Sequence, residues 1–401
     1  MATKRVAVLM LAAQILSMLG FATYSALLPE LRDTWQLSNS EAGLIGGMFF
    51  GGYVLTVTWW TSLTDRVDGR HVYLAGALAA AAGAVGFGLL AGGFWSAILL
   101  HALLGAGVAG TYMPGLRLLS DRVEGATQSR YVAFYTSFFG VGAALSIAIT
   151  GAVAAAFGWR ASFLVCAAGP LVAGLLVAFG LPAARAAPVA ASRATLAVLR
   201  NVFRNRAAVG YILGYTVHCI ELFGSRAWMV AFLGYSAGLQ AAGSEPWSAP
   251  AIAALVNLLA VPSSIIGNEI ALKIGRLRWI VIAMAISGAL GIVLGACAWL
   301  HWLLVAALLT VYSLMVMADS ATLTAGLIVA ARPEERGATM GVYSLLGFCG
   351  GMLGPALFGG ALDLTGGATS IAAWTIAYAV IGAGGLLAIP LLRIAARRSN
   401  P

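Results

Sequence analysis

The chain is a succession of apolar stretches, each about as long as the hydrocarbon core of a bilayer is thick. A helix needs roughly 20 predominantly apolar residues to cross that core. Charged residues, prolines and glycine clusters divide the sequence into twelve such stretches. We therefore expect an all-α integral membrane protein with twelve transmembrane helices, at residues 6–28, 39–62, 71–92, 95–118, 131–156, 160–182, 207–232, 249–272, 278–298, 301–327, 339–361 and 370–392.

The basic residues alternate with these spans. If the N-terminus is cytoplasmic, all of the 23 lysines and arginines except Arg32, Arg160 and Arg226 fall in or beside a cytoplasmic loop. A wrong number of spans would break this agreement. We expect a multi-pass protein of the cell (inner) membrane with both termini in the cytoplasm, whose first span is retained and is not a cleaved signal segment.

Composition also points to the bilayer as the solvent. Of the 401 residues, 61% are hydrophobic and 9% are charged, whereas a soluble domain carries about 25% charged residues. An ordinary soluble protein is therefore excluded. The net charge of +9 is explained by the basic cytoplasmic loops, so we expect the lipid bilayer as a partner and no nucleic acid.

A basic segment separates two halves of the chain. Residues 183–206 carry five arginines and no acidic residue. We predict an N-terminal six-helix bundle at 1–182, a cytoplasmic basic linker at 183–206, and a C-terminal six-helix bundle with a short cytoplasmic tail at 207–401. Parallel six-helix halves are a known transporter architecture. Three residue pairs match between the halves at one constant offset: Tyr135 with Tyr343, Gly142 with Gly350, and Gly151 with Gly359.

The loop after the second span has the sequence LTDRVDGR at 63–70. It resembles the loop motif G-x-L-x-D-R-x-G-R-R of the major facilitator superfamily, with Thr61 in place of the first glycine and Asp68 as an additional residue. The resemblance covers nearly all of the chain and implies that family's fold of two pseudo-symmetric six-helix bundles. It also implies a conformational gate at Asp65, Arg66 and Arg70, whose charges make interactions in one conformer that another breaks.

Other motifs of the family are altered. His101 stands in the fourth span where many members carry arginine, and a second copy of the loop motif at 267–276 has Leu272 where the aspartate would be. The antiporter signature G-x-x-x-G-P-x-x-G-G is absent from the fifth span, while a near copy, GGMLGP at 350–355, lies in the eleventh. The absence of this signature from the fifth span makes drug–proton antiport the weaker alternative.

Ionisable residues lie deep in two apolar spans: His218, Glu221 and Arg226 in the seventh, and Asp319 in the tenth. The resemblance implies that the first, fourth, seventh and tenth helices line a central cavity. A rise of about 1.5 Å per residue puts His218, Glu221 and Asp319 roughly 16, 21 and 18 Å from the inner surface, and Arg226 roughly 28 Å from it. The three residues of the seventh span share one helix face, and the spacing lets His218 meet Glu221.

Three interpretations of these charges stay open. In the first, Glu221 or Asp319 binds and releases a proton, which His218 shares, because burial disfavours a charged carboxylate. In the second, Arg226 attracts an anionic substrate. In the third, the groups form a structural network that holds the helices together.

Uncharged residues of the cavity helices are further candidates for substrate binding, because polar-tipped side chains suit a small polar ligand. The four cysteines are widely spaced and show no metal-ligand pattern, so we expect no metal and no cofactor. The candidate binding residues that accompany Arg226 are Gln14, Tyr112, Tyr215 and Tyr312.

The sequence as a whole predicts a secondary active transporter and not an enzyme. We expect a functional monomer that works by alternating access and carries a small polar or anionic metabolite in symport with H⁺. Two alternatives stay open: a proton-driven efflux antiporter for hydrophobic or cationic compounds, and a transporter-like sensor.

Overall fold

The computed structural model describes residues 3–123, 126–183, 196–240 and 247–397, and all of its regular elements are helices. These helices pack into two compact units. Unit 1 comprises Met1–Leu37, Met48–Ala190 and Trp247–Leu258, and unit 2 comprises Ser38–Gly47, Ala191–Pro246 and Leu259–Pro401. Arg185, Arg193 and Arg398, part of the basic pattern, lie outside the described residues.

Unit 1 is built from helices of the first half of the chain together with most of α9. The start of α3, up to Gly47, belongs to unit 2. The helices are α1 (Thr3–Ser17), α2 (Thr23–Thr34), α3 (Asn39–Leu63), α4 (Gly69–Leu90), α5 (Phe94–Ser120), α6 (Ala126–Gly180) and α9 (Ala249–Ala260).

Unit 2 contains the other helices. They are α7 (Leu196–Arg204), α8 (Arg206–Gly238), α10 (Ser263–Ile274), α11 (Arg276–Ala296), α12 (Trp302–Ala318), α13 (Ser320–Ala330), the 3₁₀ turn η1 (Pro333–Glu335), α14 (Arg336–Leu364) and α15 (Ile371–Arg397). The predicted division into 1–182, 183–206 and 207–401 stays a prediction, because the units follow packing and not chain order.

These helices correspond to twelve transmembrane spans. Within the described residues, nine helical stretches are long and apolar enough to cross a bilayer, and the apolar part of α15, Ile371–Leu386, is a shorter one. One of the nine, Arg130–Gly180, holds two predicted spans, which meet at Gly158. The first predicted span is not among the nine, because it is divided between two short helices, α1 and α2. Gly158 has φ of 81° and ψ of 169°, a backbone conformation that a residue with a Cβ adopts at a cost.

Three spans are not continuous helices, which the sequence pattern did not predict. The first span is divided between α1 and α2, the eighth between α9 and α10, and the tenth between α12 and α13. Pro262 lies at the junction of α9 and α10, where its missing N–H removes a helical hydrogen bond. The third and fourth predicted spans are separated by a turn that contains Gly92 and Gly93, since α4 ends at Leu90 and α5 begins at Phe94.

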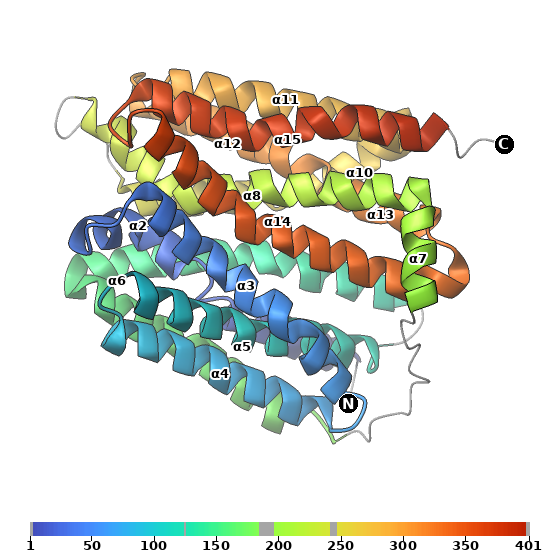
Figure 1. The fold of residues 1–401 in the computed structure, drawn as a ribbon. Coiled ribbons are helices and arrows are strands. Elements are labelled where there is room, and N and C mark those ends of the chain that lie inside the picture. Colours follow the sequence, from blue (N-terminus) through green and yellow to red (C-terminus); the bar gives the residue numbers. More distant parts are fainter. Residues whose placement is uncertain (1–2, 124–125, 184–195, 241–246, 398–401) are drawn as a thin grey trace. The chain divides into compact units, whose positions relative to one another are not determined.

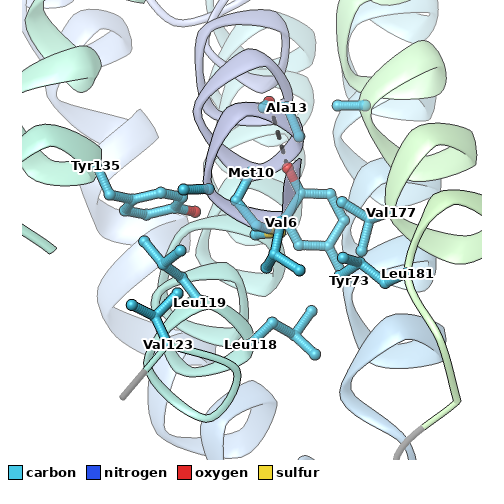
Figure 2. Close-up of a cluster of buried hydrophobic side chains, with 12 residues drawn as sticks. Val6, Met10, Ala13, Tyr73, Leu118, Leu119, Val123, Tyr135, Val177 and Leu181 are labelled. Atoms are coloured by element: carbon cyan, nitrogen blue, oxygen red, sulfur yellow. Dashed lines mark hydrogen bonds between the residues drawn. The ribbon is translucent and has the colours of Figure 1, made fainter. Parts of the chain in front are cut away.

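The core of unit 1 near the chain's start is a cluster of large apolar side chains from α1, α4, α5 and α6 (Figure 2). Tyr73 is fully buried there, and its hydroxyl donates a hydrogen bond to the carbonyl of Ala13 at 3.3 Å. This bond satisfies the one polar atom of a large ring in an apolar environment. The other labelled members are Val6, Met10, Leu118, Leu119, Val123, Tyr135, Val177 and Leu181.

In unit 2, α14 lies alongside α8 (Figure 1). Two glycines make this approach possible: a Cβ at Gly350 would overlap the carbonyl of Thr216, and a Cβ at Gly354 would overlap the carbonyl of Ile220. Small residues at helix interfaces let backbones come close in lipid, where no hydrophobic force drives helices together. The contact fixes the part of α8 that carries His218.

We predict that Gly350→Val destabilises the protein by about 1–3 kcal/mol, because the added side chain overpacks the α8–α14 interface. The measurement is the thermal unfolding midpoint in detergent. Gly341→Val is the matched control, because it lies on the same helix and a Cβ there meets nothing within 4 Å. Equal midpoints for the two variants would contradict the prediction.

Candidate functional site

The candidate site of unit 2 is carried by α8. Asn205 begins the helix, its side chain accepting a hydrogen bond from the amide of Ala208 at 3.2 Å. Such an N-cap satisfies one of the otherwise unpaired N–H groups of the first turn. The helix then runs for 33 residues without interruption, so that His218, Glu221 and Arg226 are held on one rigid element.

The imidazole of His218 and the carboxyl group of Asp319 form a buried polar pair. His218 Nδ1 lies 2.8 Å from Asp319 Oδ1, and the side chains are 2% and 4% exposed. Asp319 stands at the break between α12 and α13, and the ring of Tyr215 stacks on that of His218 with centroids 5.7 Å apart. The shared depth of His218 and Asp319 that the sequence predicted thus corresponds to a direct contact.

The break beside Asp319 is linked to the break in the neighbouring span. Ser263 Oγ donates to the carbonyl of Leu314 at 2.7 Å, and Ser264 Oγ accepts from the amide of Ala321 at 3.1 Å. Discontinuous helices of transporters commonly form substrate and ion sites, because their ends leave backbone groups free to bind. Here the two serine hydroxyls of α10 hydrogen-bond to backbone groups of α12 and α13, on either side of Asp319.

Glu221 is buried one turn along α8 and contacts a different helix. Ser287 Oγ of α11 donates to Glu221 Oε2 at 3.1 Å, and the Tyr312 side chain lies beside the carboxylate. Glu221 Oε1 has no hydrogen-bond partner within the described residues. The spacing on α8 allows His218 to meet Glu221, but the contact that the structure forms is between His218 and Asp319.

Arg226 lies further along α8 and is half-buried. Its Nη2 is 3.5 Å from the Sδ of Met317. No carboxylate pairs with Arg226 in the described part of the chain. A thioether is a weak acceptor and leaves the positive charge uncompensated. Arg226 therefore differs from His218, whose polar partner is in place.

The uncharged candidates divide between the units. Tyr215 and Tyr312 lie in unit 2, and Tyr312 packs edge-to-face on Tyr378 with centroids 5.6 Å apart. Gln14 and Tyr112 lie in unit 1. Gln14 is completely buried on α1, and neither atom of its amide is hydrogen-bonded within the described residues. The Tyr312 hydroxyl is likewise buried with no hydrogen-bond partner among the described residues. Unsatisfied buried polar groups are costly, so Gln14 and Tyr312 stay candidates for contact with a ligand.

The predicted gate loop in unit 1 is an ordered network of charges. Asp65 pairs with Arg117 of α5, whose Nη1 also donates to Thr64 Oγ1 at 2.7 Å. Arg117 is absent from the gate that the sequence predicted, because a partner two spans away gives no local signal. Arg66 is exposed.

Arg70 completes this network with a different partner. Its guanidinium pairs with Asp68 at 2.9 Å and donates to the carbonyl of Leu181 at 2.8 Å. Asp68, the additional residue of the motif, begins α4 by accepting from the amide of Arg70 at 2.9 Å. The additional residue of the motif is therefore accommodated as a helix cap.

Arg122 lies at the same end of unit 1. Burial lowers the pKa of its guanidinium group from the ordinary value.

His101, the departure in the fourth span, is buried in an aromatic environment and is not at an exposed interface. It is 2% exposed, and its ring lies 5.2 Å from that of Tyr24 and 5.7 Å from that of Phe49. These neighbours are apolar ring faces, so the position resembles a packed core site more than a charged one.

Twelve apolar spans with titratable and cationic groups buried between them define a multi-pass membrane transporter. The model of the Major Facilitator Superfamily matches residues 10–355, and the chain belongs to this family. The family is one of membrane transporters, which agrees with the apolar spans described above.

Solved structures show the same fold. A bacterial homologue of the human lysosomal transporter Spinster, in an inward-facing and unoccupied conformation, aligns with a TM-score of 0.74 and 16% identity over 98% of this chain and 95% of that chain. A variant of the nucleoside transporter NupG aligns with a TM-score of 0.73 and 16% identity over 96% and 99%.

One curated relative matches in sequence over part of its length. The putative transporter svop-1 of Caenorhabditis elegans is 26% identical over 161 residues, which are 39% of this chain and 30% of that protein. The match thus spans about a third of the relative.

We predict that replacing one partner of the buried pair destabilises the protein more than replacing both. His218→Leu and Asp319→Leu each leave a polar group unpaired in an apolar environment, at a cost of about 3–5 kcal/mol, whereas the double variant leaves none. Thermal unfolding of the three variants in detergent measures this order. Ser225→Ala, on the same helix, is the control, and strictly additive effects of the two substitutions would contradict the pairing.

Proposed function

We propose that this protein is a proton-coupled symporter that carries a small anionic or polar metabolite by alternating access. The observation that carries the proposal is the separation of charges along α8. Arg226 has no carboxylate partner among the described residues, while His218 contacts Asp319, and Glu221 Oε1 has no hydrogen-bond partner among them. An unpaired cation beside protonatable groups suits the joint binding of an anion and a proton.

Arg226 is the substrate-binding residue in this proposal. A half-buried guanidinium gains strongly from a carboxylate or phosphate, because it offers several donors in a planar fork and water screens the contact poorly. Its present neighbour, Met317, is flexible and uncharged. Tyr215 and Tyr312, which lie in the same unit as Arg226, would contribute hydrogen bonds to the polar parts of the substrate. Substrate binding by Gln14 and Tyr112 stays a prediction.

Glu221, Asp319 and His218 form the proton-coupling group. A carboxylate in an apolar environment favours its protonated form, and a neighbouring cation reverses that preference. The buried His218–Asp319 pair stays formed or opens according to where the proton lies. Since Asp319 stands at a helix break, a change in its partner acts directly on the junction of α12 and α13.

Asp65, Arg66 and Arg70 are the conformational gate of the proposal. The pairing of Asp65 with Arg117, and of Arg70 with Asp68 and the Leu181 carbonyl, joins several helix ends of unit 1. Charge pairs at helix ends act as switches when one conformer forms them and the other breaks them. The proposal includes a functional monomer in the inner membrane, with both termini in the cytoplasm as the basic residues predict.

A proton-driven efflux antiporter for cationic compounds is the second candidate. The free Oε1 of Glu221 favours it, because a buried carboxylate oxygen can attract a cation. The test is the same for both candidates: purified protein in proteoliposomes with an imposed pH gradient, screened against small carboxylates, phosphate esters and cationic amphiphiles. Inward accumulation of an anion supports symport, and outward exchange of a cation supports the alternative.

We predict that Glu221→Gln abolishes accumulation driven by the pH gradient while counterflow of the same substrate, which needs no net proton movement, persists. A glutamine keeps the size of the side chain but cannot release a proton. Glu30→Gln, which removes an exposed acid, is the matched control. Gradient-driven accumulation by Glu221→Gln at the wild-type level would rule out Glu221 as the coupling residue.

We predict that Arg226→Ala weakens binding of the transported anion by about 30-fold or more, because it removes a poorly solvated charge contact. Arg226→Lys keeps the charge and is expected to recover part of the affinity. Binding is measured by scintillation proximity with the radiolabelled anion found in the screen. An unchanged affinity in Arg226→Ala would show that the anion binds elsewhere.

A further inference from the structure

Two side-chain hydrogen bonds connect α7, and the residue that follows it, to the α13–α14 segment of unit 2. Asn201 Nδ2 donates to Glu335 Oε1 at 2.8 Å, and Asn205 Nδ2 donates to the carbonyl of Ala330, also at 2.8 Å. Val202 is buried against α8 and α14. The α7 helix therefore rests on the segment that joins α13 to α14, at the end of unit 2 where α8 also begins (Figure 1).

These attachments bring five exposed arginines to one place. They come from α7, from the start of α8 and from the α13–α14 junction. Among the described residues, the one ion pair that any of them forms is a 4.0 Å contact between Arg332 and Glu335, and Glu335 is already bonded to Asn201. Glu334 is the other acid of the junction and is exposed. We call this patch the linker-helix basic surface, and its arginines are Arg200, Arg204, Arg206, Arg332 and Arg336.

An apolar ring lies among these charges. Phe203 is 56% exposed. Arg200 and Arg204, which lie three residues before it and one residue after it on α7, are exposed as well, whereas Val202 is buried. A short helix with one buried face and an outer face of arginine and phenylalanine is typical of a segment at the membrane–water interface. The beginnings of the membrane-spanning helices α8 and α14 lie at that level.

We propose that the linker-helix basic surface binds the headgroup of an anionic phospholipid. The guanidinium groups of Arg200 and Arg204 hold the phosphate, Arg206, Arg332 and Arg336 supply the surrounding positive potential, and Phe203 contacts the lipid below its headgroup. A free phosphate ion would use the arginines but leave the exposed ring of Phe203 in water, so the combined surface fits a lipid. The bound lipid stabilises the packing of α7 against the rest of unit 2. This inference does not depend on the proposed transport function.

The experiment places the full-length protein in nanodiscs of phosphatidylcholine with increasing fractions of phosphatidylglycerol. Fluorescence quenching by a headgroup-labelled phosphatidylglycerol reports binding. We expect saturable binding by the wild type and about 30-fold weaker binding by the Arg200→Gln/Arg204→Gln variant, since each basic residue near an anionic surface contributes substantially. The Arg200→Lys/Arg204→Lys variant keeps the charge and is expected to retain most of the binding.

The matched control is Lys273→Gln/Arg278→Gln, which removes two exposed charges from another loop of unit 2. Its binding is expected to equal that of the wild type. Equal losses in the two glutamine variants would overturn the proposal in favour of a general charge effect, as would wild-type binding by Arg200→Gln/Arg204→Gln. Competition by inorganic phosphate at the concentration of the lipid phosphate would show a small-anion site and overturn the lipid assignment.

Thermal unfolding in pure phosphatidylcholine controls for folding. The variants are expected to unfold there at the wild-type temperature, because the substituted side chains are exposed. Phosphatidylglycerol is expected to raise the midpoint of the wild type and of the loop control but not that of Arg200→Gln/Arg204→Gln. Phe203→Ser tests the apolar contact separately, and unchanged lipid affinity in that variant would remove Phe203 from the site.

Discussion

The scarcity of water between the helices is the constraint on which the rest of this structure depends. Backbone polar groups in such an environment must be satisfied within the chain, which is why the described spans are helical. Charged side chains face the same requirement at a higher cost. His218 and Asp319 meet it in part by pairing with each other, while His218 Nε2 has no hydrogen-bond partner among the described residues. Glu221 meets it in part through Ser287. Arg226 does not meet it with a carboxylate among the described residues, and this is the strongest reason to assign it a ligand.

Close helix packing is a second consequence of the same environment. Without a hydrophobic force between helices, association depends on van der Waals contact and on interhelical hydrogen bonds. Gly350 and Gly354 supply the first by letting the backbone of α14 reach that of α8. Ser263 and Ser264 supply the second between α10 and the α12–α13 break. The titratable residues thus lie where helices are held closely, and a change in charge there acts on packed elements.

The charges at the ends of the spans follow a different rule, because water and lipid headgroups are near. In the gate loop, Asp65 and Asp68 each pair with an arginine. The Asp65–Arg117 pair and the bond from Arg70 to the Leu181 carbonyl join segments that are distant in sequence. On the linker-helix basic surface, arginines outnumber acids, and the surplus has no partner within the described chain. Paired charges suit a switch between conformers, whereas unpaired ones suit binding of an external anion.

Hydropathy, basic-residue alternation and the loop motif were sufficient to predict the class, the family and the number of spans, because length and polarity are local properties. Helical rise alone also predicted that His218 and Asp319 share one level, which agrees with their contact. Their pairing did not, since His218 was equally placed to meet Glu221 on its own helix. The breaks at Ser17, Ala260 and Asp319, the role of Arg117, and the gathering of arginines around α7 were decided by tertiary structure. Each depends on contacts between helices distant in sequence, and a local pattern of apolar and polar residues carries no record of which helices become neighbours.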